Sequence, residues 1–315
     1  MAQRTHRLIQ LTDTHIVDED KALYTKETLP DGRAVGAVDS AANLAHALEV
    51  VGEHADGLTA LLLTGDLAND GTPDAYRRLR AMVEPVAERL GVPAIYGMGN
   101  HDHRDTFRIG LLDGAPAPAG AIYGGTEAGG ERDLFAPVDY VVELNGLRIV
   151  MVDSTVPGSH HGALSDVQLA WLTSTLAEPA PAGTIVTLHH PPFHGRDDGP
   201  EAALMESVRF ASIAELADVV RGTDVRVVLG GHWHEPYGGQ IGGVPVWAGP
   251  SSAMAHHIGG GMFQIVPSSG FSIIDVFDDA TVVTRAVNCL ERPILHELSM
   301  DDLLERIALS AAARG

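Results

Sequence analysis

The sequence predicts an α/β fold, because short apolar runs alternate with amphipathic stretches along most of its 315 residues. Each apolar run has the length of a buried strand and is bounded by polar residues or glycine. The runs that predict strands are 8–11, 61–63, 94–96, 149–152, 185–188 and 225–229. The amphipathic stretches between them are long enough for helices that cover a sheet.

Turn signals between neighbouring apolar runs predict antiparallel hairpins. Asn145-Gly146 and Gly242-Gly243 are dipeptides typical of two-residue hairpin turns. Asp278-Asp279 indicates another turn, between two further strands. Because parallel and antiparallel pairs then occur together, we expect the sheets to be mixed.

Amphipathic stretches with recognisable starts predict helices. The first is expected to begin with Ser40 as its cap, and the second with Thr72 as cap and Pro73 at the first helical position. A third helix is expected to start at Ser165, and a fourth to carry the apolar face of residues 213–220. These helices fall between the strands, as in an α/β domain.

The chain shows no linker and no internal repeat, so we expect a single domain over residues 1–315 with a core over about 7–290. Ser299 followed by Asp302 indicates the start of a terminal helix over about 299–313. This helix has an apolar stripe that packs either on its own domain or on a second subunit. A homodimer is therefore one of the partners we consider.

Charge and composition exclude several classes of protein. The 21 basic and 42 acidic side chains leave a net charge of −21, which argues against binding long nucleic acid or an anionic membrane. No run of apolar residues has the length of a membrane span, and the first residues do not form a secretory signal. The single cysteine, Cys289, excludes a disulfide framework. We expect a cytoplasmic protein.

Polar side chains follow the ends of five predicted strands. In an open α/β sheet, the carboxyl ends of the strands meet at one crevice, so these side chains are expected to converge. The expected metal ligands among them are Asp13, His15, Asp66, Asn100, His189, His232 and His234.

The types and spacing of these residues fit two metal ions. In extended chain, residues i and i+2 point the same way, which would pair Asp13 with His15 and His232 with His234. Glycines before Asp66, Asn100 and His232 permit close backbone approach. Oxygen and imidazole donors without thiolate suit Fe, Mn, Zn, Co or Ni. Two divalent ions with two carboxylates and one hydroxide would leave about one positive charge, which attracts a small anion.

The ordered motifs resemble the calcineurin-like metallophosphoesterase superfamily, over about residues 7–250. They are Asp13-x-His15, Gly65-Asp66, Gly99-Asn100-His101-Asp102, His189-x-Pro191 and Gly231-His232-x-His234. Within the superfamily, the chain is most similar to the bacterial class III cyclic-nucleotide phosphodiesterases. The resemblance implies a four-layer αββα sandwich of two mixed sheets, with a dinuclear metal site at the sheet edges.

The resemblance also implies a role for each motif residue. Asp13, His15 and His234 would bind one metal ion. Asn100, His189 and His232 would bind the other, and Asp66 would bridge the two. A metal-bridging hydroxide would then attack phosphorus.

Two more residues of the same motifs would act on the substrate. His101 would contact the phosphate or protonate the leaving oxygen, and Asp102 would orient its ring. Asn100, His101 and His234 would contact the substrate. The implied reaction hydrolyses a 3′,5′-cyclic nucleotide such as cAMP to the 5′-monophosphate.

Several alternatives stay open. The enzyme could act more broadly on phosphodiesters, including glycerophosphodiesters and 2′,3′-cyclic nucleotides, or the chain could be a non-catalytic scaffold. Purple acid phosphatases have a tyrosine where this chain has Asn69, and Ser/Thr protein phosphatases have an arginine where this chain has Asp70, so neither group fits. His190 is assigned either to packing or to support of the ligands. The pairs 160–161 and 256–257 could line a pocket wall.

Overall fold

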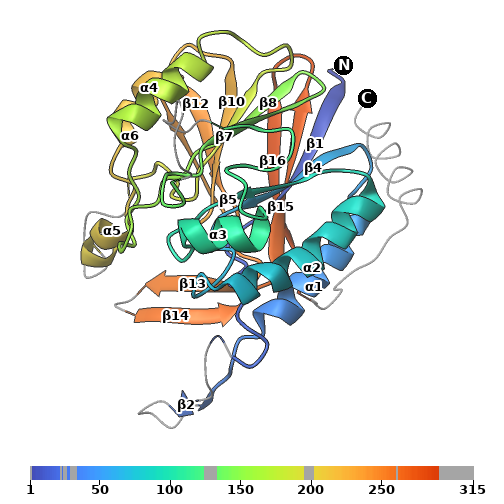
Figure 1. Cartoon of the computed structure of the whole chain (residues 1–315), viewed down its shortest axis with the longest axis vertical. Coiled ribbons are helices and arrows are strands. Elements are labelled where there is room, and N and C mark those ends of the chain that lie inside the picture. Colours follow the sequence, from blue (N-terminus) through green and yellow to red (C-terminus); the bar gives the residue numbers. More distant parts are fainter. Residues whose placement is uncertain are drawn as a thin grey trace, which may run out of the picture.

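The computed structural model describes residues 2–21, 23, 27–28, 34–123, 133–194, 202–259 and 262–290. Two large sheets form the centre of the fold (Figure 1). The five-stranded sheet has the order β16 (Val282–Asn288), β15 (Gly270–Phe277), β1 (Arg4–Leu11), β4 (Leu58–Thr64), β5 (Ala94–Gly97). The seven-stranded sheet has the order β11 (Tyr237–Ile241), β12 (Val244–Ala248), β10 (Val225–Gly230), β9 (Thr184–Thr187), β8 (Leu147–Met151), β7 (Tyr140–Leu144), β6 (Ile122–Tyr123).

Both sheets are mixed, as the sequence predicts. In the five-stranded sheet, β1 pairs in parallel with β4, which pairs in parallel with β5, while β15 runs antiparallel to β1. In the other sheet, β8, β9, β10 and β12 are parallel, and β7 and β11 return as hairpins. Asn145 has φ 52° and Gly146 has φ 87°, the left-handed geometry that closes a two-residue hairpin.

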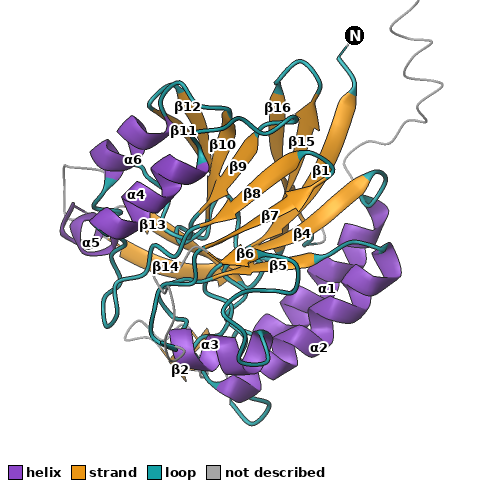
Figure 2. Cartoon of the chain, turned by 45° about the horizontal axis from the view of Figure 1, so that its top comes forward, coloured by secondary structure: helices purple, strands orange, loops and turns teal. Residues whose placement is uncertain are grey.

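Helices cover the outer face of each sheet, which confirms the four-layer αββα arrangement (Figure 2). On the five-stranded sheet lie α1 (Ser40–Glu53) and α2 (Pro73–Leu90), followed along the chain by α3 (Arg104–Leu111). On the seven-stranded sheet lie α4 (Asp166–Thr175) and α6 (Ile213–Val220).

The alternation of side chains along the strands explains this layering. In β8, Leu147, Ile149 and Met151 belong to the hydrophobic cluster that includes residues of both sheets. Val150, which points the other way, belongs to the cluster beneath α4 and α6. Burying one such side chain contributes about 1.5–3 kcal/mol, so both faces of this strand stabilise the sandwich.

Short elements were not predicted from the sequence. They are α3, α5 (Ala202–Val208), the hairpin of β13 (Met254–Gly259) and β14 (Met262–Pro267), and the pair β2 (Glu27–Thr28) and β3 (Ala34–Val35). In Figure 1, β13 and β14 form a separate two-stranded sheet below the two large sheets.

Some expectations fall outside the described residues. They include the terminal helix over about 299–313 with Ser299 and Asp302. The single-domain organisation therefore stays a prediction. Among the helices that the structure describes, none combines the length and the apolar character needed to cross a membrane.

The start of α1 differs from the expectation by one residue. Asp39 is the N-cap, because its Oδ1 accepts a hydrogen bond of 2.9 Å from the backbone N–H of Ala42. Ser40, expected as the cap, is instead buried, and its Oγ donates to the carbonyl oxygen of His15. The serine thus ties the helix to the loop after β1.

We predict that Asp39→Ala lowers the free energy of unfolding by about 1 kcal/mol, because a backbone N–H of α1 loses its partner. Asp39→Asn keeps a side-chain oxygen at the same place and should remain close to the wild type. Urea unfolding followed by circular dichroism measures both. An equal loss in the two variants would contradict the cap assignment.

Candidate metal centre

The expected ligands come from loops at the carboxyl ends of five strands. In the five-stranded sheet these loops follow β1, β4 and β5, which run parallel to one another. In the seven-stranded sheet they follow β9 and β10, which are also parallel. Parallel strands end at the same edge of a sheet, so each sheet delivers its polar residues to one place.

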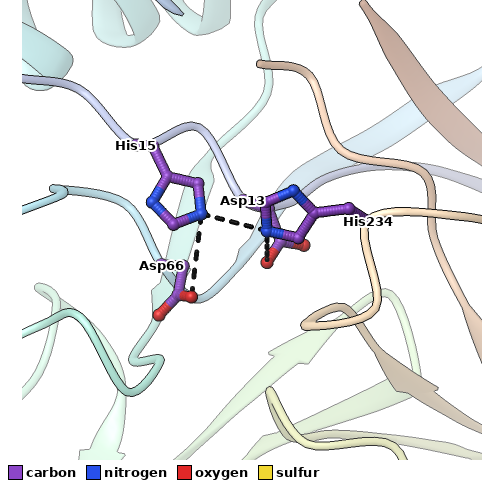
Figure 3. Close-up of side chains that lie close together, drawn as sticks. All are labelled: Asp13, His15, Asp66 and His234. Carbon is purple, nitrogen blue, oxygen red and sulfur yellow. Dashed lines mark hydrogen bonds and ion pairs between the residues drawn. The ribbon is translucent and has the colours of Figure 1, made fainter. Parts of the chain in front are cut away.

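A first group brings together Asp13, His15, Asp66 and His234 (Figure 3). One ligand atom from each lies within 4.8 Å of the others, and all four residues are buried. The Nε2 atoms of His15 and His234 are 3.1 Å apart. The carboxylates face these rings, with 3.4 Å from His234 Nε2 to Asp13 Oδ1 and 3.8 Å from His15 Nε2 to Asp66 Oδ2.

A second group contains Asp66, His189 and His232, with ligand atoms within the same limit of 4.8 Å. The Nε2 atom of His189 lies 3.2 Å from Asp66 Oδ2 and 3.8 Å from Asp13 Oδ1. Asp66 belongs to both groups, so its carboxylate lies between two clusters of nitrogen donors. This is the arrangement in which one carboxylate can serve two ions.

The loops that carry these residues are not extended, which corrects the spacing argument. Five of the eight non-glycine residues with positive φ in the described chain belong to the two groups, namely Asp13, His15, Asp66, His232 and His234. A left-handed residue turns the chain, so the rule for i and i+2 in a strand does not apply. His232 and His234 accordingly fall in different groups. Such backbone strain is concentrated at functional sites.

Glycines next to the ligands allow the close approach that the sequence predicts. A Cβ on Gly99 would lie 2.2 Å from the backbone nitrogen of Asp66. A Cβ on Gly231 would lie 2.0 Å from Thr12 Oγ1 and 2.6 Å from Asp13 Oδ2. Because both distances are far below van der Waals contact, the loops can pack in this way only without side chains at these positions.

Backbone carbonyl groups orient three of the histidine rings. His189 Nδ1 donates to Thr64 O, His232 Nε2 donates to Val208 O, and His234 Nδ1 donates to Met254 O, at 3.0, 2.8 and 2.9 Å. A carbonyl oxygen only accepts, so the proton sits on that nitrogen and the other ring nitrogen presents a lone pair. In His189 this other nitrogen, Nε2, is buried and has no hydrogen-bond partner among the described residues. A metal ion is the usual partner for such an atom.

Asn100 lies at the same edge and has a similar unpaired atom. Its Oδ1 is buried without a hydrogen-bond partner among the described residues. Its Nδ2 lies 3.3 Å from Nδ1 of His160. The amide therefore has an oxygen available for a cation.

The structure corrects the expected relation between His101 and Asp102. His101 Nδ1 donates to the carbonyl oxygen of Asn69 at 2.8 Å, so Asn69 holds the ring. The buried carboxylate of Asp102 instead accepts from backbone N–H groups of the two neighbouring loops and from the hydroxyl of Tyr76. Asp102 thus fixes the loops after β4 and β5 against each other. Its side chain faces these donors rather than the imidazole.

The electrostatics of the two groups favour a cation. Burial raises the pKa of Asp13. Burial alone would lower the pKa of His189, but Asp66 and Asp13 beside it raise this pKa to about 9. Burial lowers the pKa of His15 and of His232 to about 3, so both rings are neutral at pH 7. The two buried carboxylates therefore attract positive charge, and the neutral rings of His15 and His232 can bind a metal.

Sequence reasoning left two neighbouring histidines without a specific role. His256, on β13, stacks on the ring of His234 with 3.7 Å between ring centroids. The ring of His160 lies 6.0 Å from that of His101. Both belong to histidine pairs that the sequence offered as pocket walls, and no motif distinguished them.

Solved structures share this fold. A dimetal phosphatase from Danio rerio superposes with a TM-score of 0.60 over 92% of this chain and 98% of that chain, at 15% sequence identity. A purple acid phosphatase from yellow lupin superposes with a TM-score of 0.55 over 91% of this chain and 52% of that chain, at 13% identity. At such low identity the likeness concerns the fold alone.

Curated relatives are similar over most of the chain. A protein from Rhodococcus erythropolis named "Probable cyclic nucleotide phosphodiesterase" is 38% identical over 88% of this chain and 82% of its own length. A Mycobacterium tuberculosis protein named a cAMP/cGMP dual specificity phosphodiesterase is 36% identical over 87% of this chain and 77% of its own length. The profile of the calcineurin-like phosphoesterase family matches residues 6–236, which include all the loops described above. With this match and these relatives, the chain belongs to the calcineurin-like phosphoesterase family.

Proposed function

We propose that this protein is a dinuclear metal-dependent phosphodiesterase that hydrolyses 3′,5′-cyclic nucleotides, such as cAMP, to the 5′-monophosphate. The observation that carries the proposal is the pair of buried ligand groups that share Asp66. The names of the relatives from Rhodococcus and Mycobacterium support the choice of substrate. The net charge of −21 favours a small anionic substrate over a long polyanion.

The residues divide between two ions as follows. Asp13, His15 and His234 would hold one ion. Asn100, His189 and His232 would hold the second, and Asp66 would contact both. The donors are carboxylate, amide and imidazole, which suit Mn, Fe, Zn or Co. Divalent ions at such a site supply Lewis-acid activation of water and of phosphoryl oxygens.

The chain's own groups would bind and orient the phosphate. His101 is partly exposed beside the first group, with its ring 4.8 Å from that of His15. Because Nδ1 of His101 is occupied by the carbonyl of Asn69, its Nε2 is the atom that can contact a phosphate or give a proton to the leaving oxygen. Asn100, His101 and His234 are the residues we assign to substrate contact.

We predict that the metal-loaded protein hydrolyses cAMP with a higher kcat/KM than bis(p-nitrophenyl) phosphate, glycerophosphodiesters or 2′,3′-cyclic nucleotides. Removing the metal with a chelator should abolish turnover, and Mn²⁺ should restore it. Steady-state kinetics on this panel measures the order of preference. A much better substrate than cAMP would move the assignment to a broader phosphodiesterase, and no turnover of any diester with metal bound would refute it.

Asp66→Ala should abolish diester hydrolysis and lower the bound metal below two ions per chain, because both groups lose the carboxylate they share. The matched control is Asp70→Ala in the same loop, where the carboxylate is half exposed. The control should keep its metal and its rate. Metal content by elemental analysis and kcat on cAMP give the two readouts, and full metal content in Asp66→Ala would contradict the bridge.

His101→Ala should keep its metal but reduce kcat for cAMP by about 10²–10⁴-fold, the range for loss of a general acid. The reduction should be smaller for bis(p-nitrophenyl) phosphate, because p-nitrophenolate leaves without a proton. His103→Ala, in an exposed position two residues later, serves as control. Equal reductions on the two substrates would point to phosphate binding instead of proton transfer.

A further inference from the structure

His190 is a fully buried histidine that belongs to neither ligand group. Its Nε2 lies 3.2 Å from the carbonyl oxygen of His160, and its Nδ1 lies 2.8 Å from the hydroxyl of Ser154. A carbonyl oxygen only accepts, so Nε2 donates to it, and Nδ1 accepts from Ser154. Both nitrogens are therefore committed to the segment 154–162.

The His190 ring also has two close neighbours besides its hydrogen-bond partners. On one side, a Cβ on Gly162 would lie 2.3 Å from the ring, so the backbone of this segment packs directly on the imidazole. On another side, the ring of His232 lies 4.5 Å away, centroid to centroid. His190 thus lies between a residue proposed to bind metal and the loop after β8.

The same loop is tied to His232 by a second route. A β-bridge between Thr155 and Gly162 closes the loop. The N–H of Gly162 donates to Arg209 O at 3.0 Å, one residue after Val208, whose carbonyl accepts from His232. The base of the 154–162 loop and the ring of His232 are therefore both hydrogen-bonded to the backbone of residues 208–209.

At its tip, the loop brings His160 to Asn100. The amide nitrogen Nδ2 of Asn100 can only donate, so Nδ1 of His160 accepts across the 3.3 Å that separates them. This contact decides which way the amide is turned. With Nδ2 engaged, Oδ1 is the atom left buried and unpaired, available for the ion.

From these contacts we infer that His190 and His160 are positioning residues that keep the Asn100 amide with its oxygen facing the metal site. His190 holds the backbone of the 154–162 loop, and the His160 ring at the tip of that loop engages the amide nitrogen. The inference rests on the proposed dinuclear site and assigns the support of its second ion.

Substitutions can distinguish the contributions of the two hydrogen bonds that the ring nitrogens of His190 make. His190→Gln places an amide N–H near the original Nε2 and can still donate to the carbonyl of His160. His190→Asn is shorter and can reach only the position of Nδ1 beside Ser154. The two variants are similar in polarity, so a difference between them reports the contact with the loop.

Calorimetric titration of the metal-depleted full chain with MnCl₂ tests the inference. His160→Ala should raise the Kd of one of two Mn²⁺ ions by about 10–100-fold, the usual effect of losing the group that orients a ligand. His190→Asn should act on the same ion in the same direction, while His190→Gln stays within about twofold of the wild type. In the double variant His160→Ala/His190→Asn, the Kd should exceed that of His160→Ala by no more than about twofold.

Hydrogen exchange in the metal-free protein adds a readout that needs no metal. Backbone amides of residues 155–162 should exchange faster in His190→Asn than in His190→Gln. The control is His257→Ala, because His257 is an exposed histidine on β13. His257→Ala should change neither the Kd for Mn²⁺ nor the exchange rates of residues 155–162.

The outcomes separate the two proposals. An unchanged Mn²⁺ affinity in His160→Ala, whose exposed side chain makes misfolding no explanation, overturns the inference. The inference is also overturned if the Kd for Mn²⁺ in the double variant rises by the product of the two single-variant effects. A wild-type protein that binds fewer than two Mn²⁺ ions overturns the dinuclear function itself, and this inference with it.

Discussion

The attraction between two buried carboxylates and positive charge is the constraint on which the rest of the site depends. Asp13 and Asp66 lie fully inside the protein, where an unpaired anion is costly. Imidazole rings lie close to both carboxylates, and burial keeps those of His15 and His232 neutral. The strained backbone at five of the site residues persists because the surrounding sandwich is rigid and well packed. The fold thus holds two buried carboxylates close together, and bound cations would neutralise their negative charge.

Fold and ligand positions follow closely from the sequence, and the reason lies in local chemistry. Apolar runs predict the strands, and pairs such as Asn145-Gly146 predict the hairpins, because both depend on neighbouring residues. Convergence of the polar loops follows from parallel strands that end at one edge. The order of the motifs along the chain identifies the family, because five separate strand ends present the residue types that the family has there.

Contacts between loops distant in sequence could not be predicted. The ring of His101 is held by the carbonyl of Asn69, and backbone carbonyls carry no residue-specific signal. Asp102 is adjacent to His101, yet its carboxylate bonds N–H groups of Leu67 and Ala68, which belong to another loop. The left-handed φ of His232 is likewise a product of tertiary packing, so a rule for extended chain failed there.

The division of the ligands between the two sheets has a mechanical consequence. Asp13, His15 and Asp66 emerge from one sheet, whereas His189, His232 and His234 emerge from the other. Ions bound as proposed would have ligands from both sheets, so the two layers could not separate without breaking metal–ligand bonds. Because such ions would bind the folded chain and not the unfolded one, their binding would stabilise the whole sandwich, and their removal would lower its free energy of unfolding.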